Sequence, residues 1–246
     1  MSFIQAKAPA THDFYRQVHK GLRLALSQLL LRIGACDADD ADSLKTLLAD
    51  LRFQMEVSEH HLANEDLYIH TALEERAPGA AARLDATHAD HRETFATLEV
   101  MIRGLETCDA ATRAARLRGL YLRFSTFVAE DFAHMAEEEQ LILPVLQSLF
   151  TNEELMAIEA EIVAALEPRH LMTFGRAMIP AATRSERLVM VGNIRAHAPP
   201  QAFQALMELS ARPSLNDSDF AHLCEGLGIS PAYETRGGES PSYAHG

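Results

Sequence analysis

Apolar residues recur at spacings of three and four along almost the whole chain, which is the period of an amphipathic α-helix. The pattern predicts four long helices, over about residues 11–34, 42–77, 80–106 and 111–149. Short links rich in turn residues join them, and long helices with short links are typical of an antiparallel bundle. The expected fold class is therefore all-α: an antiparallel, up-down four-helix bundle followed by a smaller C-terminal helical region.

After residue 150 the pattern changes, because five prolines between residues 168 and 213 divide the chain into shorter helices. Thr151 with Glu154, and Thr183 with Glu186, have the spacing of a capping box that begins a helix. The last stretch, PAYETRGGESPSYAHG, holds turn and polar residues without a period, so we expect a disordered tail. The predicted organisation is a four-helix bundle over 1–150, a helical extension over 151–230 and a tail over 231–246.

One histidine–carboxylate motif occurs twice. Residues 61–69 read HLANEDLYI and residues 134–142 read HMAEEEQLI, an offset of 73 positions between 61 and 134. His19 in the first helix recurs as His91 in the third at an offset of 72, and CDA at 36–38 recurs at 108–110 with the same offset. The first two helices are thus echoed by the next two, which predicts a bundle with pseudo-two-fold symmetry.

Residues four apart lie on nearly the same face of a helix, so each His–Glu pair projects together. If both pairs face the bundle axis, four imidazoles and two carboxylates meet at one level. Buried carboxylates are unfavourable unless they are paired or bound to metal, and two together repel. Imidazole with carboxylate suits iron, and also manganese or zinc. The predicted metal ligands are His19, His61, Glu65, His91, His134 and Glu138.

Two alternatives deserve comparison with this interpretation. A single HxxxE pair on a helix is usually solvated, so the metal interpretation depends on the repeat and on the partner histidines. A ferritin-like di-iron bundle needs Glu-x-x-His on two helices and a lone Glu on the others. Here His precedes Glu, and the one match, Glu167 to His170, lies outside the bundle. The pattern therefore argues against a ferritin-like oxidase.

The order His, HxxxE, His, HxxxE over four helices resembles the hemerythrin family, in particular its HHE cation-binding branch. The segments that carry the resemblance are His19, HLANEDLYI, HADHRETFATLE and HMAEEEQLILP, within about residues 11–149. The resemblance implies a non-haem di-iron centre with oxo or hydroxo and carboxylate bridges. It implies that Glu65 and Glu138 bridge the irons, that the four histidines are terminal ligands, and that the centre reacts with dioxygen, nitric oxide or peroxide.

The chain departs from the oxygen-carrying hemerythrins, which have HxxxH on the third helix and HxxxxD on the fourth. Here His88 and His91 are three apart, and the fourth helix carries HxxxE. His88 is an additional candidate ligand, because positions i and i+3 share a face. We favour His88 as a supporting or surface residue, and we expect Glu139 to be solvated. His70 is expected to face outward, because it lies about 180° round the helix from His61. Simple oxygen storage is therefore disfavoured.

A second branch of the family, which repairs iron–sulfur clusters, carries an additional N-terminal domain with cysteine. Here the extra region is C-terminal and contains only Cys224, which weakens a transfer of that function. The C-terminal histidines His170, His197 and His222 lack a repeated carboxylate partner, so we expect no second metal site there. His60 points about 100° away from His61 and is expected to be exposed. Apolar stripes in this region suggest packing on the bundle or a homodimer surface.

The formal net charge of −13 disfavours nucleic acid and anionic membrane surfaces as partners. No run of 18 apolar residues occurs, and the start, MSFIQAKAPATHDFY, lacks the apolar core of a signal peptide. We therefore expect a cytoplasmic protein without a membrane partner. Three widely spaced cysteines do not form a disulfide framework. Cys36 and Cys108 are expected to be reduced thiols at one end of the bundle rather than a redox pair.

Two classes of function follow from these expectations. The first is a protein that binds or senses dioxygen, nitric oxide or peroxide at a centre of four His and two Glu. The alternative is a di-iron enzyme that decomposes peroxide, reduces nitric oxide or oxidises a small substrate, or a protein of iron handling and stress repair. A sealed apolar pocket would favour reversible binding, and a channel with acid–base groups would favour turnover.

Overall fold

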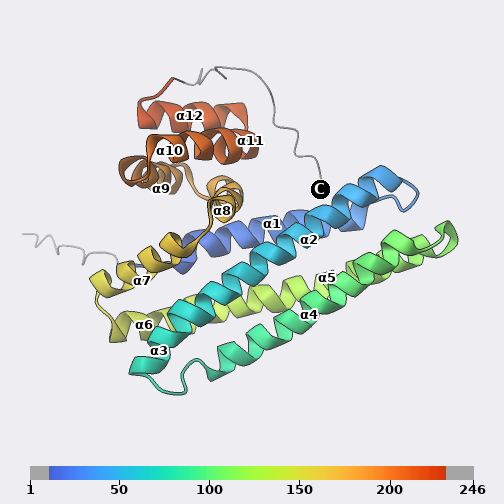
Figure 1. The fold of residues 1–246 in the computed structure, drawn as a ribbon, viewed down its shortest axis with the longest axis horizontal. Coiled ribbons are helices and arrows are strands. Elements are labelled where there is room, and N and C mark those ends of the chain that lie inside the picture. Colours follow the sequence, from blue (N-terminus) through green and yellow to red (C-terminus); the bar gives the residue numbers. More distant parts are fainter. Residues whose placement is uncertain (1–10, 231–246) are drawn as a thin grey trace, which may run out of the picture.

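Four helical rods lie side by side in the first part of the chain (Figure 1). The computed structural model describes residues 11–230, and the expected tail at 231–246 lies outside them. Among the described residues there is no strand, so the expected all-α class is confirmed. The rods are α1 (Tyr15–Ala35); α2 (Ala41–Asn64) with η1 (Glu65–His70) and α3 (Thr71–Arg76); α4 (Ala82–Thr107); and α5 (Ala110–Glu137) with η2 (Glu138–Ile142) and α6 (Leu143–Leu149).

The bundle is held by an apolar core to which every rod contributes. Leu26 of α1, Leu51 of α2, Leu98 of α4 and Phe124 of α5 are all fully buried. An aspartate caps the start of α2 and another caps the start of α5. Asp40 accepts a hydrogen bond from the Ser43 amide, and Asp109 accepts one from the Thr112 amide. A cap satisfies one of the free N–H groups of a helix start. The α1–α2 and α4–α5 links, which contain Cys36 and Cys108, lie at the same end of the bundle (Figure 1).

A π-helical turn begins at the glutamate of each repeated motif. In the second rod it begins at Glu65, and in the fourth it begins at Glu138, so the two turns start at equivalent positions. A π turn closes its hydrogen bonds from i to i+5 and therefore contains more residues per turn than an α-helix. Side chains beyond the turn are rotated relative to the α-helical expectation. Such turns are frequent at functional sites.

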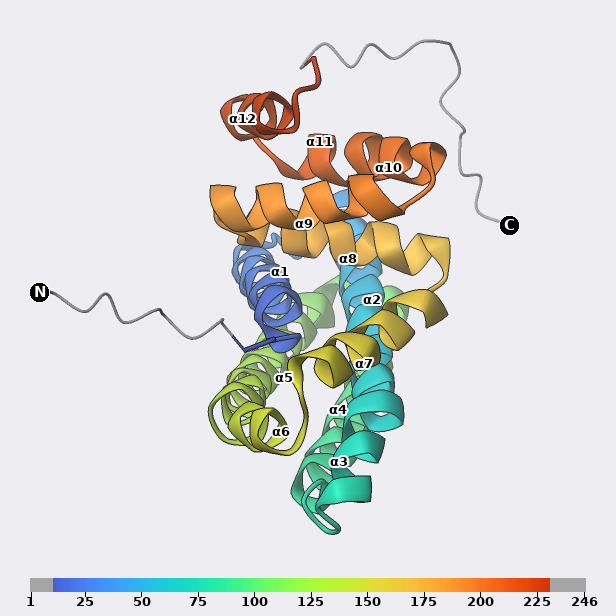
Figure 2. The same ribbon diagram turned by 90° about the vertical axis from the view of Figure 1, so that its left-hand side faces the viewer.

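The C-terminal helices pack on the side of the bundle that α1 and α2 form (Figures 1 and 2). Both predicted capping boxes are confirmed, at Thr151–Glu154 before α7 and at Thr183–Glu186 before α9. The two parts come close together at Gly21 of α1, where an added Cβ would lie 3.0–3.2 Å from the backbone of α8. The elements are α7 (Asn152–Ala165), α8 (Pro168–Ala181), α9 (Arg184–His197), α10 (Pro200–Leu206), η3 (Met207–Ala211), α11 (Arg212–Ser214) and α12 (Asp217–Leu227).

A second apolar core lies within these helices. Val191 of α9, Met207 of η3 and Phe220 of α12 belong to it, and each is at most 5% exposed. Within residues 11–230, no single helix is both long and apolar enough to cross a bilayer.

Candidate metal centre

The two His–Glu pairs of the repeat meet in the bundle interior, where the π turns begin. His61 Nε2 lies 3.2 Å from Glu65 Oε1, and His134 Nε2 lies 3.4 Å from Glu138 Oε1. Glu65 is 2% exposed and Glu138 is fully buried. Each pair projects from one face of its helix, as the spacing of four predicts.

His19 of α1 lies between the two carboxylates. Its Nε2 is 3.6 Å from Glu65 Oε1 and 3.4 Å from Glu138 Oε2. Two of the four groups of candidate ligand atoms in residues 11–230 contain Glu65, and the atoms of each group lie within 4.8 Å of one another. One group is His19, His61 and Glu65, and the other is Glu65, His88, His134 and Glu138.

His88, rather than His91, brings α4 into this cluster. His88 is fully buried, and its Nε2 lies 3.7 Å from Glu65 Oε2, 3.9 Å from Glu138 Oε1 and 2.8 Å from His134 Nε2. His88 is therefore not a surface residue, and its role as a ligand or as a support for one stays a prediction. Its distances to the two carboxylates resemble those of His19, so His88 is the pseudo-symmetric counterpart of His19.

His91 lies one turn away from this position. It is buried, its ring stands edge-on to the rings of His134 and Phe127, and its two nitrogens have no hydrogen-bond partner. Its Nδ1 is 3.7 Å from Asp131 Oδ1. None of the four candidate ligand groups among the described residues includes it. Ligation by His91 stays a prediction that this geometry does not favour.

Each half of the bundle also orients one histidine through a carboxylate and an arginine. In one half, His19 Nδ1 lies 3.1 Å from Glu139 Oε1, and Arg23 Nη1 donates to that oxygen at 2.7 Å. The expectation of a solvated Glu139 is therefore wrong. Hydrogen bonding of one ring nitrogen fixes the tautomer and leaves the other nitrogen free to bind metal.

The other half repeats this arrangement. His88 Nδ1 lies 2.6 Å from Asp66 Oδ1, and Arg92 Nη2 donates to Asp66 Oδ2 at 2.7 Å. The sequence contains the signal for both halves: HxxxR occurs at 19–23 and at 88–92, an offset of 69, and an acidic residue follows each buried glutamate. The sequence-based comparison paired His19 with His91 at an offset of 72, so it did not pair His19 with His88.

His70 is buried rather than outward-facing, which corrects the sequence-based expectation. It is 3% exposed, its Nδ1 lies 2.7 Å from Asp85 Oδ1, and its ring stacks on His88 at a centroid distance of 4.8 Å. The expectation assumed an α-helical rotation per residue between His61 and His70. The π turn between them rotates the chain less per residue and brings His70 towards α4.

Burial controls the charge of the clustered groups. Burial raises the pKa of Glu65 well above its usual range, and the charge of Glu138 raises it further. Burial lowers the pKa of His88 to about 4 and that of His134 to about 2. The pKa of His61 is also lowered well below its usual range by burial. At neutral pH the imidazoles are therefore neutral, which is the form that binds metal.

A cation would satisfy polar atoms that the protein leaves without partners. Within residues 11–230, no hydrogen bond reaches His19 Nε2, either oxygen of Glu65 or either oxygen of Glu138, and all are buried. A buried carboxylate without a partner is strongly unfavourable. Imidazole nitrogen and carboxylate oxygen together form a donor set that suits iron, manganese or zinc. The residues present therefore fit a metal centre.

Tyr15 covers the His19 side of the cluster. It is 1% exposed, its ring stacks on His19 at a centroid distance of 4.9 Å, and its hydroxyl has no hydrogen-bond partner. Burial, followed by the charges of Glu138 and Glu65, raises its pKa well above the usual range. The hydroxyl therefore stays protonated and is a free hydrogen-bond donor beside the candidate ligands.

A polar hollow reaches His91 from the surface between α4 and α5. Its volume is about 410 Å³, and it is open to solvent. Asp131, whose Oδ1 is 3.7 Å from His91 Nδ1, is 6% exposed and has its pKa raised to about 7 by burial. The hollow is lined by Thr87, Asp90, His91, Glu93, Thr94, Thr97, Arg123 and Glu130.

Comparison with known proteins supports this interpretation of the bundle. The family model for the hemerythrin HHE cation binding domain matches residues 10–146. A zinc finger protein named BRUTUS-like, from Arabidopsis thaliana, is 26% identical over 210 residues, which cover 83% of this chain and 16% of that protein. A second BRUTUS-like zinc finger protein from the same plant is 24% identical over 148 residues, which cover 60% of this chain and 12% of that protein. The chain thus spans less than one fifth of either relative. No solved structure matches the chain significantly.

Proposed function

This chain belongs to the hemerythrin family of HHE cation-binding domains, and we propose that it is a non-haem di-iron protein that binds or senses dioxygen, nitric oxide or peroxide. Cation binding, typically of iron, is the property of the matched domain. The observation that supports two ions is the pair of candidate ligand groups that share Glu65. The buried carboxylate oxygens in these groups have no other partner.

The two groups suggest how the ions would be held. His19 and His61 would bind one ion, and His88 and His134 would bind the other. Glu65 belongs to both groups, and Glu138 lies within 3.4 Å of both His19 and His134. A carboxylate has two oxygens, so both glutamates can contact both ions. His88 therefore replaces His91 in the ligand set that we propose.

When bound, the irons supply electrons and open coordination positions for a diatomic ligand or peroxide. The protein supplies the surroundings of that position. His19, His88 and Glu138 are fully buried, so bulk water is excluded from the cluster. The Tyr15 hydroxyl can donate a hydrogen bond to a small ligand beside His19. A closed site with one free donor is suited to binding a small ligand rather than a large substrate.

One observation favours a second candidate function, a di-iron oxidoreductase. Asp131 has a pKa of about 7 and lies 3.7 Å from His91, which borders the polar hollow. A carboxyl group that titrates near neutral pH can accept and release protons at a useful rate. The hollow, His91 and Asp131 would together supply a path for protons from solvent towards the cluster. Turnover of peroxide or nitric oxide would require such a path.

Metal analysis and optical spectroscopy of the full chain test the proposal. We expect two irons per chain after aerobic purification. A visible band that appears with oxygen after anaerobic reduction and disappears when oxygen is removed would support binding or sensing. Rapid reoxidation without such a band, with peroxide consumed at steady state, would support the enzyme. Metal-free protein that folds and takes up no iron would refute both.

A matched pair of variants tests the ligand set. His88→Ala should lose iron, whereas His91→Ala should keep it, because only His88 reaches both carboxylates. Both residues lie on α4 and are buried, so any general effect on the bundle is shared. If His91→Ala loses iron and His88→Ala does not, the structural assignment is wrong and the sequence repeat is the better guide.

A further inference from the structure

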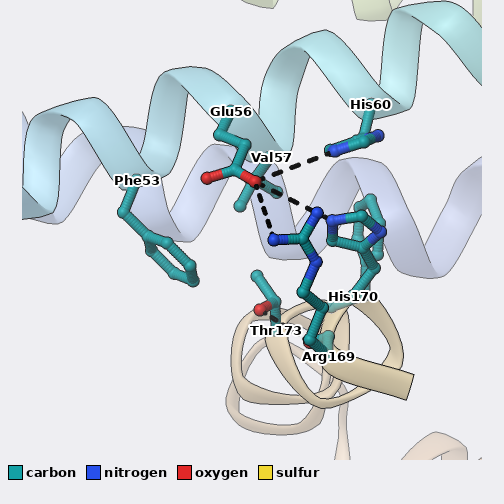
Figure 3. A pocket seen from close by; sticks show the side chains of 8 residues that line it. Phe53, Glu56, Val57, His60, Arg169, His170 and Thr173 are labelled. Atoms are coloured by element: carbon teal, nitrogen blue, oxygen red, sulfur yellow. Dashed lines mark hydrogen bonds and ion pairs between the residues drawn. The ribbon is translucent and has the colours of Figure 1, made fainter. Parts of the chain in front are cut away.

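A second histidine–carboxylate cluster lies outside the bundle core, where α8 crosses α2 (Figure 3). Glu56 and His60 are one turn apart on α2, and His170 comes from α8. One ligand atom from each of the three lies within 4.8 Å of the others. They border a cavity of about 90 Å³ that is also lined by Val57 and Phe174.

The two imidazoles face the same carboxylate oxygen. His60 Nε2 and His170 Nε2 are each 3.9 Å from Glu56 Oε1, and the two ring centroids are 3.8 Å apart. A separation of 3.9 Å is too long for a hydrogen bond. The His170 side chain is 11% exposed, and its Nε2 is buried without a hydrogen-bond partner. A buried imidazole nitrogen that points at a carboxylate without bonding to it indicates room for a shared partner between them.

We propose that Glu56, His60 and His170 bind a divalent transition-metal ion of the zinc class. Zinc binds imidazole nitrogen and carboxylate oxygen at about 2.0–2.2 Å, and three protein ligands with one water complete its tetrahedron. Tetrahedral ligand atoms then lie about 3.4 Å apart, so these atoms must approach by about half an ångström. The Glu56 and His60 side chains are 49% and 38% exposed, which leaves them free to rotate towards His170.

Arg169 is a cation that faces the same carboxylate. Its Nη1 lies 3.9 Å from the same oxygen, Glu56 Oε1, and its side chain is 66% exposed. An exposed ion pair at this distance contributes little to stability. A divalent ion that gains two imidazoles as well as the carboxylate displaces the guanidinium into solvent.

The bound ion would join the C-terminal helices to the bundle beside the candidate iron centre. His60 is the chain neighbour of His61, and His170 lies near the start of α8. The two sites share no ligand, so the zinc site does not depend on the di-iron proposal. The His60 side chain is 38% exposed, in line with the sequence-based expectation. The expectation of no second metal site considered α2 and the C-terminal region separately, so it did not include the contact between the rings of His60 and His170.

Zinc uptake by the iron-loaded full chain tests the proposal. The protein is incubated with zinc, passed through gel filtration and analysed for both metals. We expect one zinc per chain in addition to unchanged iron. His170→Ala should lose this zinc, and Glu56→Gln should bind it at least about tenfold more weakly, because even residues that only support a ligand contribute about 10–100-fold. His197→Ala removes an exposed histidine elsewhere in the C-terminal region and should retain the zinc.

Two further measurements keep the test decisive. Zinc should raise the Tm of the wild-type protein but not that of Glu56→Gln, because an ion that binds only the folded state stabilises it. Glu56 is half exposed, so this variant folds even if His170→Ala does not. Arg169→Ala should tighten zinc binding, because it removes the competing cation. Wild-type protein without additional zinc, zinc that replaces iron, or equal zinc in His170→Ala and His197→Ala would overturn the proposal.

Discussion

Replacement of Asp66 by asparagine tests whether the carboxylate–arginine pairs hold the candidate ligands in place. Asp66 Oδ1 lies 2.6 Å from His88 Nδ1, and its Oδ2 accepts a hydrogen bond from Arg92 Nη2 at 2.7 Å. Burial would raise the pKa of Asp66, but hydrogen bonds from Arg92 and His88 outweigh it and lower that pKa. The carboxylate is therefore charged at neutral pH and holds the His88 proton on Nδ1.

Asparagine keeps the size of the side chain and removes its charge. The amide oxygen can still accept from His88, but the amide nitrogen then faces Arg92, so the imidazole is oriented less firmly and is less basic. Loss of such a partner reduces metal affinity by about 10–100-fold, or about 1.4–2.8 kcal/mol. Competition with a chelator, followed by iron analysis, measures the affinity of Asp66→Asn against the wild type.

Glu59→Gln is the matched control. Glu59 Oε1 accepts from Arg92 Nε at 2.8 Å, so this variant also removes a negative charge next to Arg92. No hydrogen bond joins Glu59 to His88 among the described residues, and iron affinity should therefore stay within about twofold of the wild type, as expected for an exposed surface pair. Equal iron affinity in Asp66→Asn and the wild type would refute the reasoning. An equal loss in both variants would show that overall charge, not the His88 contact, controls iron binding.

Four other substitutions give expected outcomes of different sign. Glu138→Gln should lower iron content but leave the metal-free chain at least as stable in urea. The reason is that burial raises the pKa of this unpartnered carboxyl and makes its charge unfavourable. Marked destabilisation of the variant without metal would contradict this expectation. Glu186→Gln should lower the free energy of unfolding by up to about 1 kcal/mol at pH 7, because the ion pair with Lys20 Nζ at 2.6 Å is lost, while the glutamine oxygen can still accept from the Thr183 amide in the capping box. The pKa of Glu186 is about 2, so this difference should be full above pH 4.5 and shrink as pH falls towards 2, and a pH-independent difference would exclude the ionic contribution. Gly21→Ala should destabilise by about 1–3 kcal/mol because its Cβ meets the α8 backbone, whereas Gly119→Ala, with its nearest side-chain atom at 3.6 Å, should stabilise by about 0.5–1 kcal/mol in thermal melts.

Local periodicity accounts for the features that were predicted correctly. The spacing of His61 and Glu65 places both side chains on one helix face whatever the tertiary structure, and the same holds for His134 and Glu138. The capping box at Thr151 is likewise a contact within one turn, and it is present as predicted. These features depend on residues at most four positions apart, so the sequence contains the whole of the information.

Short-range spacing does not predict whether His88 or His91 contacts the two buried glutamates. Both lie on the inner side of α4, three residues apart, and both are buried. Which of them reaches Glu65 and Glu138 depends on how far α4 is shifted along its own axis relative to α2 and α5. That shift is fixed by side-chain packing in the core, where Leu98 and Phe124 are fully buried. A repeat offset of 72 or 69 cannot decide it, since either is compatible with the same helix face.

The helical rods, the paired His–Glu motifs and the expectation of a metal centre can all be derived from the amino-acid sequence, because each follows from side-chain period and from the unfavourable burial of carboxylates. Only the tertiary structure decided which histidine of α4 joins them, because axial register depends on packing between helices. The π turn at Glu65 re-aimed His70, and the crossing of α8 over α2 brought His170 to Glu56, more than a hundred residues away in the chain. Contacts between such distant segments form only when whole helices pack together, so short-range sequence patterns do not predict them.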